Sequence, residues 1–369
     1  MPFSNHFNTA GEYFIKRFGR KVCKLPLALA ETCPNRDGTC GTGGCIFCSV
    51  GGSGEFAASV KGGVAEAILA AKELISGKLK PGEKPLYVAY FQSFTSTHAP
   101  FEILEKCFTE AVLTDDVAAI SVATRPDALP PNVIALLGRL NLIKPVFVEL
   151  GLQTSDDATA GFINRCCGSA LYKEKALELR ARGIEVIMHM IVGLPCGSPA
   201  EGSCGGAAAI TDGFPAGGPC GFPVGGTCGF PAGGACGETD AEGFFPVESL
   251  QQLRATCEFI AAAGATGVKI QVLSVLKNTA LENYYDAGKI RALTLEEYGS
   301  ALCDIIGWLP ADVVIHRITG DPPKELIRAP LWTQDKKKVM NYLSLLMDRR
   351  GVAQGSGIRM EPAEPAGFS

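Results

Sequence analysis

The stretch KLPLALAETCPNRDGTCGTGGCIFC, residues 24–48, couples a strand to a loop rich in cysteine. Residues 24–30 are a short apolar run of the kind that forms a buried strand. Residues 33–48 then hold four cysteines and four glycines within sixteen positions. Glycines let the backbone wrap closely around a bound group, and cysteine thiolates bind zinc and iron–sulfur clusters. The stretch therefore predicts a strand that leads directly into a metal-binding loop.

The spacing of these cysteines leaves the metal open. Cys45 and Cys48 form a C-x-x-C pattern that supplies two ligands from one turn, and a cysteine upstream supplies a third. If three thiolates hold a [4Fe–4S] cluster, one iron stays open to another ligand. Zinc asks for a fourth protein ligand, which Cys40 can provide. From spacing alone, an iron–sulfur cluster, a zinc site and inert cysteines remain alternatives.

The composition narrows the class of protein. The chain has 369 residues, 47% of them hydrophobic and 20% charged, which is enough for one large α/β-barrel domain or two ordinary domains. A net charge of −4 gives no general attraction to nucleic acid or to anionic membranes. We find no apolar run long enough to span a bilayer and no secretory pattern in residues 1–10. We therefore expect a cytoplasmic protein, in which fifteen cysteines indicate metal binding or catalysis rather than disulfides.

Apolar runs alternate with amphipathic segments along most of the chain. This alternation predicts a parallel sheet wrapped by helices. Six strands before the C-terminal region favour an α/β fold with a partial, TIM-like (β/α)6 barrel and a small C-terminal extension. The predicted strands are residues 24–30, 86–91, 117–123, 146–152, 184–192, 268–275 and 313–318. The predicted helices are residues 60–76, 101–113, 132–140, two pieces within 156–182, 248–263, 295–309 and 336–350.

One segment breaks the alternation. Residues 196–236 are rich in Gly, Pro, Ala and Cys and contain three similar octapeptides, at 213–220, 221–228 and 229–236. Such a composition buries too little side chain to offset the entropy of ordering, so we expect an insertion that loops out of the domain. The predicted division is a lead-in at 1–20, a core barrel at 21–285 with this insertion, a C-terminal α/β extension at 286–350 and a disordered tail at 351–369.

Further motifs near the predicted strands resemble a known family. With the run CPNRDGTxGxGGCxFC, they are similar to the radical S-adenosylmethionine (SAM) enzymes, and among these to the uncharacterised bacterial YhcC-like family. That family is related to the elongator catalytic subunit and to oxygen-independent coproporphyrinogen oxidase. The resemblance spans about residues 10–350 outside the insertion. Its motifs are FIKRFGRKV (14–22), AYFQSFTST (89–97), ATRPD (123–127), VELGLQT (148–154), FINR (162–165), IVGLP (191–195), VLKNT (275–279), HRITGD (316–321) and APLW (329–332).

The resemblance implies a pair of cofactors and a reaction. It places the ligands of a [4Fe–4S] cluster at Cys33, Cys45 and Cys48, and it leaves Cys40 as a bystander. SAM would bind the remaining iron through its amino and carboxylate groups. One electron, delivered by a donor such as flavodoxin or ferredoxin, would cleave SAM to methionine and a 5′-deoxyadenosyl radical that abstracts hydrogen from a substrate. The substrate stays open, as a small molecule or an RNA.

The same resemblance assigns SAM-binding residues at the carboxyl ends of the strands, which share one rim in such folds. Phe47 would contact adenine, and Gln92 and Thr95 would bind the SAM amino group. Arg165 would pair with the SAM carboxylate through two hydrogen bonds. The remaining assignments are Glu149 and Gln153 for the ribose hydroxyls, and the backbone of Ile191, Val192 and Gly193 for adenine.

The catalytic residues remain unknown, with four candidates. Tyr90 and His316 would donate protons or bind substrate. Arg125 and Asp127 would orient substrate, or pair with each other.

The insertion interrupts one family motif, and this keeps two other hypotheses open. In the family, GLP continues directly as GET, whereas here GLP stands at 193–195 and GET at 237–239. The chain could therefore be a radical SAM scaffold with impaired catalysis. The other alternative is a zinc-stabilised binding module without redox chemistry.

Overall fold

Eight strands form one sheet in this computed structural model, which describes residues 2–52, 54–77, 79–196, 239 and 243–358. Their order is β2-β1-β3-β4-β5-β6-β7-β9, and neighbouring strands run parallel. The predicted α/β class and partial (β/α)6 sheet are confirmed, with β9 added from the C-terminal region. The strands are β1 (Val22–Ala28), β2 (Ala58–Ser59), β3 (Leu86–Phe91), β4 (Val117–Thr124), β5 (Val146–Gln153), β6 (Glu185–Val192), β7 (Gly267–Val272) and β9 (Val314–Arg317).

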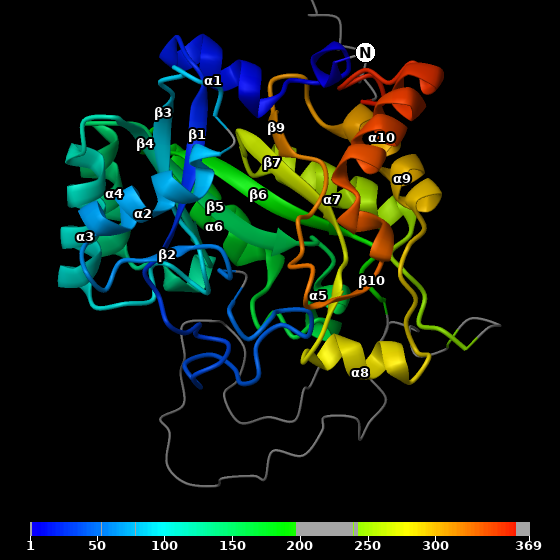
Figure 1. Cartoon of the computed structure of the whole chain (residues 1–369). Helices are drawn as coiled ribbons and strands as arrows, with labels where there is room; N and C mark the ends of the chain where they lie inside the picture. The colour runs from blue at the N-terminus through cyan, green and yellow to red at the C-terminus, as the bar shows by residue number, and fades with distance from the viewer. Residues whose placement is uncertain (1, 53, 78, 197–238, 240–242, 359–369) are drawn as a thin grey trace, which may run out of the picture.

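Most of the described helices pack along the outer side of the sheet (Figure 1). Two of them begin with reciprocal capping boxes, at Ser249 and Thr294, which satisfy backbone N–H groups of the first turn. The helices are α1 (Ala10–Phe18), α2 (Val64–Ser76), α3 (Phe101–Leu113), α4 (Pro131–Asn141), α5 (Asp157–Phe162), α6 (Ser169–Arg180), α7 (Leu250–Ala262), α8 (Ala280–Asp286), α9 (Leu295–Trp308) and α10 (Lys336–Arg350). Short 3-10 turns are η1 (Phe3–Asn5), η2 (Pro126–Ala128) and η3 (Leu331–Gln334).

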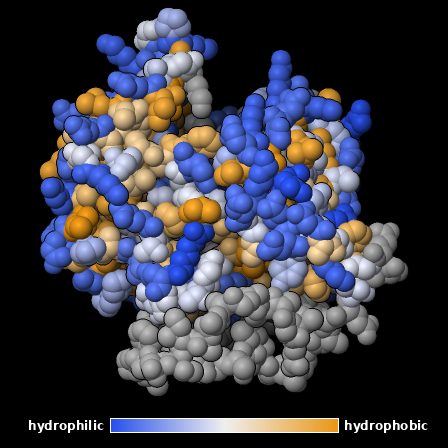
Figure 2. Space-filling view, turned by 60° about the horizontal axis from the view of Figure 1, so that its bottom comes forward, coloured by the Kyte–Doolittle hydropathy of each residue, from blue (hydrophilic) through white to orange (hydrophobic). Residues whose placement is uncertain are grey.

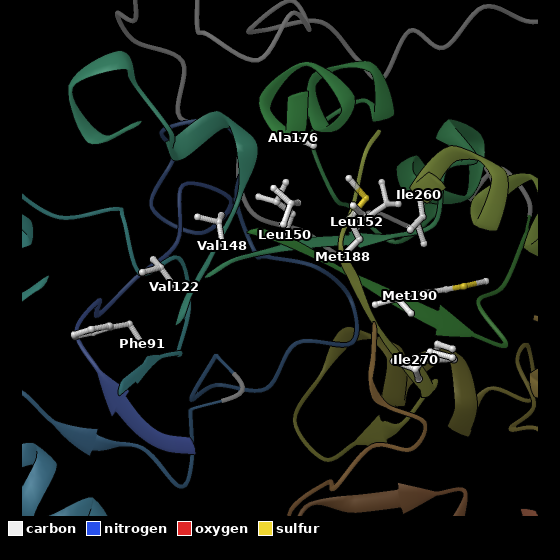
Figure 3. Close-up of a cluster of buried hydrophobic side chains, with 14 of the residues drawn as sticks. Phe91, Val122, Val148, Leu150, Leu152, Ala176, Met188, Met190, Ile260 and Ile270 are labelled. Carbon is white, nitrogen blue, oxygen red and sulfur yellow. The ribbon is translucent and has the colours of Figure 1, made fainter. Parts of the chain in front are cut away.

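The main core lies between the sheet and these helices. Side chains of a strand alternate between its two faces, and one face of β3 to β7 supplies large apolar residues to this core. Figure 3 shows part of this cluster, with side chains from β3 to β7 and from two of the helices. Among its members are Phe91, Val122, Val148, Leu150, Met188 and Ile270.

The opposite face of the sheet carries a smaller apolar cluster. It contains Val88, Ala119, Phe147 and Ile187, which alternate with core residues along their strands. Phe14 of α1 packs into this cluster, edge-on to Phe147 with ring centroids 5.9 Å apart. Helix α1 therefore covers the amino end of the inner face, opposite the rim where the strands end.

Several elements were absent from the sequence prediction. Residues 1–20 include α1, and the predicted strand at 268–275 divides into β7 and β8 (Val275–Leu276). Strand β8 pairs antiparallel with β10 (Ile327–Ala329). The chain also stays ordered to residue 358, because Gln354 N donates to His6 O at 2.9 Å and Gly357 N donates to Gly307 O at 2.8 Å. This part of the predicted tail therefore packs on the domain, and residues 359–369 lie outside those described.

Backbone hydrogen bonds join the start of the predicted insertion, at residue 196, to a segment that begins ten residues beyond its predicted end at 236. Cys196 N donates to Pro246 O at 2.7 Å, and Glu248 N donates to Leu194 O at 3.0 Å. These flanks form a short antiparallel bridge. The insertion itself, beyond Cys196, lies outside the described residues. Among the helices that are described, none combines the length and the apolar character needed to cross a membrane.

Replacing Leu150 by alanine tests the main core between the sheet and the helices. The Leu150 side chain is fully buried, so Leu150→Ala should lower the free energy of unfolding by about 2–5 kcal/mol, measured by urea denaturation. Leu142→Ala is the matched control, because Leu142 is 88% exposed and its loss should change stability by less than about 0.5 kcal/mol. Equal effects of the two substitutions would contradict the core described above.

Candidate functional site

The cysteines belong to the connection between β1 and β2, residues 29–57, which we name the cysteine loop. It lies at the carboxyl ends of the strands, at the bottom of Figure 1, opposite α1. Two neighbours hold its middle: Ile46 N donates to Ile163 O at 3.1 Å, and Leu281 N of α8 donates to Ile46 O at 2.8 Å. Figure 2 shows this end of the molecule with hydrophobic and hydrophilic residues side by side.

Two asparagines fasten the cysteine loop to the end of α5. The buried side chain of Asn35 donates from Nδ2 to Asn164 O at 2.5 Å. In return, Asn164 donates from Nδ2 to the carbonyl oxygens of Thr42, at 3.1 Å, and Gly44, at 2.8 Å. The backbone of Asn164 has a positive φ of 53°, which asparagine tolerates better than most residues. Both residues belong to motifs quoted above, but sequence reasoning gave neither a role.

Arg36 holds the loop beyond its last cysteine. Its Nη2 donates to Cys48 O at 3.1 Å and to Ser49 O at 2.6 Å, and its Nη1 donates to Val50 O at 3.2 Å. The guanidinium also lies 5.2 Å from the ring centroid of Phe94, in the turn after β3. One side chain thus fixes three consecutive carbonyl groups of the cysteine loop.

The three predicted cluster ligands lie close enough to affect one another. Burial raises the pKa of the Cys45 thiol, and the neighbouring sulfur of Cys33 raises it further. Burial also raises the pKa of Cys48 to about 12, with Cys45 and Cys33 adding to the effect. Arg125 acts in the opposite direction on Cys45. Loss of protons from these thiols therefore calls for a nearby cation.

Hydrogen-bond donors also point at two of the sulfur atoms. Thr95 Oγ1 donates to Cys33 Sγ at 3.2 Å, and Asn35 Nδ2 lies 3.8 Å from Cys45 Sγ. Donors of this kind tune iron–sulfur clusters, so these residues fit such a group. Within the described ranges, no three His, Cys, Asp or Glu side chains are grouped so as to hold a metal ion as they stand.

Some predicted SAM residues gather beside the cysteine loop. Thr95 contacts Cys33, and Gln92 begins the same turn after β3. Phe47 packs against the apolar cluster that contains Ile191. Gly193 has φ +93°, and a Cβ there would lie 2.9 Å from Leu293 Cδ1, so this close approach requires glycine.

Gln153 and Val192, two further residues predicted to bind SAM, differ in the atoms that they leave available to a ligand. Gln153 has φ +66°, and its buried Oε1 has no hydrogen-bond partner, which leaves an acceptor available to a ligand. The side chain of Val192 belongs to the main core. The backbone carbonyl oxygen of Val192 accepts a hydrogen bond from Leu273 N at 2.9 Å. The predicted backbone contact of Val192 with adenine would have to use other atoms.

Arg165 is used inside the protein. Its guanidinium is 1% exposed and donates to the carbonyl oxygens of Leu152 (2.5 Å), Thr154 (2.6 Å) and Cys167 (2.8 Å). It also forms an ion pair with Asp157 at 3.2 Å. These contacts join α5 to the end of β5. A two-bond pair with the SAM carboxylate, as predicted, would require some of them to break.

Arg125 and Asp127 pair with each other. Two hydrogen bonds of 3.0 Å join Nε and Nη2 of Arg125 to the carboxylate. Arg125 also donates to Arg165 O at 2.8 Å and lies 3.6 Å from Cys40 Sγ. This pair therefore supports the cysteine loop from the β4 side, and its predicted role toward substrate remains a prediction.

Glu149, Tyr90 and His316 lie together, away from the cysteines, on the inner face of the sheet. Glu149 is fully buried, and it accepts hydrogen bonds from Ser121 at 2.7 Å and from His189 at 2.9 Å. It also pairs with Lys24, at 2.8 Å, and with Lys269. Although burial opposes ionisation, the two lysines hold the pKa of Glu149 well below its usual range. The carboxylate is thus a buried counter-charge, and its predicted role as a ligand of ribose stays a prediction.

The lysines around Glu149 escaped the sequence analysis. Lys24 and Lys269 stand within apolar runs, and each is the third residue of its strand. A lysine inside a buried strand was the available signal, since such a residue needs a partner.

Residues 265–349 match the family model of the Radical_SAM C-terminal domain. The protein YtqA of Bacillus subtilis is 34% identical over 358 residues, which cover 96% of this chain and 94% of that protein. Protein YhcC of Escherichia coli K12 is 30% identical over 359 residues, which cover 97% of each chain.

A solved structure shows the same fold at low identity. The archaeal Methanocaldococcus infernus Elp3 with an N-terminal deletion aligns with a TM-score of 0.57 and 13% identity. The alignment covers 90% of this chain and 64% of Elp3, less than two thirds of that protein. At this identity the likeness concerns the fold alone, whereas the two bacterial relatives match over nearly their full length. The chain belongs to the YhcC-like family of the radical SAM superfamily.

Proposed function

We propose that the chain is a radical SAM enzyme that holds a [4Fe–4S] cluster through Cys33, Cys45 and Cys48. The observation that carries this proposal is the cysteine loop itself. It brings Cys33, Cys45 and Cys48 into one loop with hydrogen-bond donors at two of the sulfur atoms, and it is fastened at the carboxyl rim of a parallel sheet, where such folds place their sites. When bound, the reduced cluster supplies the electron that splits SAM into methionine and a 5′-deoxyadenosyl radical, which then abstracts hydrogen from the substrate.

The chain's own residues would position SAM beside the loop. Phe47 and Ile191, which share one apolar cluster, offer a wall for adenine. Gln153 Oε1 offers an acceptor for a hydroxyl group. Thr95 donates to Cys33 and would stay in contact with the ligand sulfur.

The electron would come from a separate protein. The cysteine loop lies at the rim of the sheet, and its three cysteines are partly exposed as whole residues, which would keep a bound cluster near the surface. We propose a flavodoxin or ferredoxin as the donor and a cytoplasmic setting. The zinc-stabilised module and the impaired scaffold become outcomes of the experiments below.

Substitution of single cysteines tests the ligand set. Protein purified without oxygen should contain iron and acid-labile sulfide in equal amounts, and Cys33→Ala, Cys45→Ala or Cys48→Ala should each lose most of the bound iron, because each removes a thiolate ligand. Cys40→Ala, in the same loop, is the matched control and should keep its iron. Zinc in place of iron, lost also with Cys40→Ala, would support the binding module.

Reductive cleavage of SAM tests the activity. The dithionite-reduced protein should convert SAM to methionine and 5′-deoxyadenosine, detected by chromatography, because an electron reaches SAM only through an intact cluster. Cys45→Ala should give no product. An iron-loaded wild-type protein that forms neither product would identify an impaired scaffold. If SAM is cleaved, the size fractions of a cell extract that increase the formation of 5′-deoxyadenosine would contain the substrate.

Gln153 tests the SAM pocket separately from the cluster. Gln153→Ala should raise the KM for SAM about tenfold with unchanged iron content, since it removes one buried hydrogen bond to the ligand. Gln251→Ala, at an exposed position of α7, is the control. An unchanged KM would remove Gln153 from the pocket.

A further inference from the structure

The inner face of the sheet has three layers, which can be followed along β6. Ile187 belongs to the apolar cluster closed by Phe14, and Ile191 belongs to the cluster that Phe47 joins at the rim. His189 lies between them, about 7 Å from each at 3.3 Å per residue. All three side chains face the same way, because strand residues alternate between faces.

Polar side chains from seven strands meet around the level of His189. We name them the inner polar cluster. It consists of Lys24 (β1), Tyr90 (β3), Ser121 (β4), Glu149 (β5), His189 (β6), Lys269 (β7), and His316 and Arg317 (β9). In Figure 1 these strands run side by side toward the rim that bears the cysteine loop. The inner polar cluster therefore lies on the inner face below that rim, and we call this level of the inner face the floor.

Basic groups outnumber acidic ones in this floor. In the part of the chain that the structure describes, one carboxylate, Glu149, acts on Lys24, Lys269 and the two histidines. The ammonium groups of both lysines lie over the ring of Tyr90, 4.8 and 4.4 Å from its centroid. Arg317 adds a third basic side chain, whose charge acts on Lys269 and His189.

This excess of positive charge is costly where the groups are buried. Burial lowers the pKa of Lys269 well below its usual range, and Lys24 and Arg317 lower it further against the attraction of Glu149. Burial likewise lowers the pKa of His189 to about 4. Buried charges require partners, so a second anion would relieve the crowding.

Two atoms in the cluster still lack partners. Arg317 donates through Nη2 to Gln271 Oε1, but its buried Nε has no acceptor. Nδ1 of His316 is also buried without a partner, and the imidazole packs so closely on β7 that a Cβ at Gly267 would lie 2.7 Å from it. Solvent reaches the floor, because the side chains of Lys24 and His189 are 27% and 17% exposed.

We propose that the inner polar cluster binds an anionic group of the substrate, a carboxylate or a phosphate, through Lys24, Lys269 and Arg317. Glu149 is the fixed counter-charge that keeps the basic groups together when the anion is absent. The inference rests on the proposed function in one respect: it names the substrate class of that site. A substrate held by its anion at the floor would extend toward the rim, where the cysteine loop lies.

Anion binding is tested on the full-length protein, purified without oxygen, by calorimetric titration. The probes are inorganic phosphate and succinate, each at constant ionic strength with chloride as the balancing ion. At least one should bind the wild-type protein, and the preferred probe distinguishes a phosphate from a carboxylate on the substrate. If neither binds, the proposal is overturned.

Substitutions of opposite sign make the test specific. Lys269→Met should weaken binding about tenfold or more, because it removes a charge beside the anion. Lys24→Met, at the partly exposed edge, should act in the same direction with less disturbance of packing. Glu149→Gln removes the competing carboxylate and should tighten binding. Lys336→Met, whose ammonium pairs with Asp321 on the surface, is the matched control and should change nothing.

A loss of fold cannot imitate this pattern, because unfolding would not tighten binding in Glu149→Gln. Binding that Lys24→Met and Lys269→Met leave unchanged would overturn the proposal. So would an increased KM for SAM in folded Lys269→Met, since the floor would then serve the cofactor. Anion binding needs no SAM cleavage, so failure of the proposed function and failure of this inference give different results.

Discussion

The hydrogen bonds between Asn35, Asn164 and the carbonyl groups of the cysteine loop are the constraint on which the site depends. A loop with four glycines within sixteen residues has much conformational entropy to lose, and its own side chains bury little apolar surface. Its shape is therefore held from outside by the end of α5 and from within the loop by Arg36. The parallel sheet matters to the site because it sets where these supports stand.

Much of the fold could be predicted because the residues of each strand indicate that strand without reference to distant parts of the chain. Residues 86–91 form an unbroken apolar run, and such a run identifies a strand buried on both faces whatever surrounds it. Helix α1 could not be identified in this way, since its role is to place Phe14 against residues far away in sequence. The division between β7 and β8 likewise depends on pairing with β10, a distant partner.

The candidate site divides in the same manner. The assignment of the three cysteines as ligands stays a prediction, and the sequence could make it because their spacing and the motif around them lie within one stretch of chain. The contacts of Arg165 and Glu149 could not be predicted, because a charged side chain in such a motif suits a ligand and a structural partner equally well. In the structure, carbonyl oxygens surround Arg165, and basic groups from β1 and β7 surround Glu149.

Because a backbone bridge joins the flanks of the insertion, the length of the insertion has little effect on the stability of the domain. Because Cys196 and Pro246 are already joined, whatever stands between them closes a loop whose ends are fixed. Loop-closure entropy grows only with the logarithm of length, so one more octapeptide added to roughly fifty residues costs about 0.1 kcal/mol. Tandem copies can thus be gained or lost by the gene at almost no thermodynamic cost to the sheet. Selection for folding therefore constrains the number of repeats only weakly.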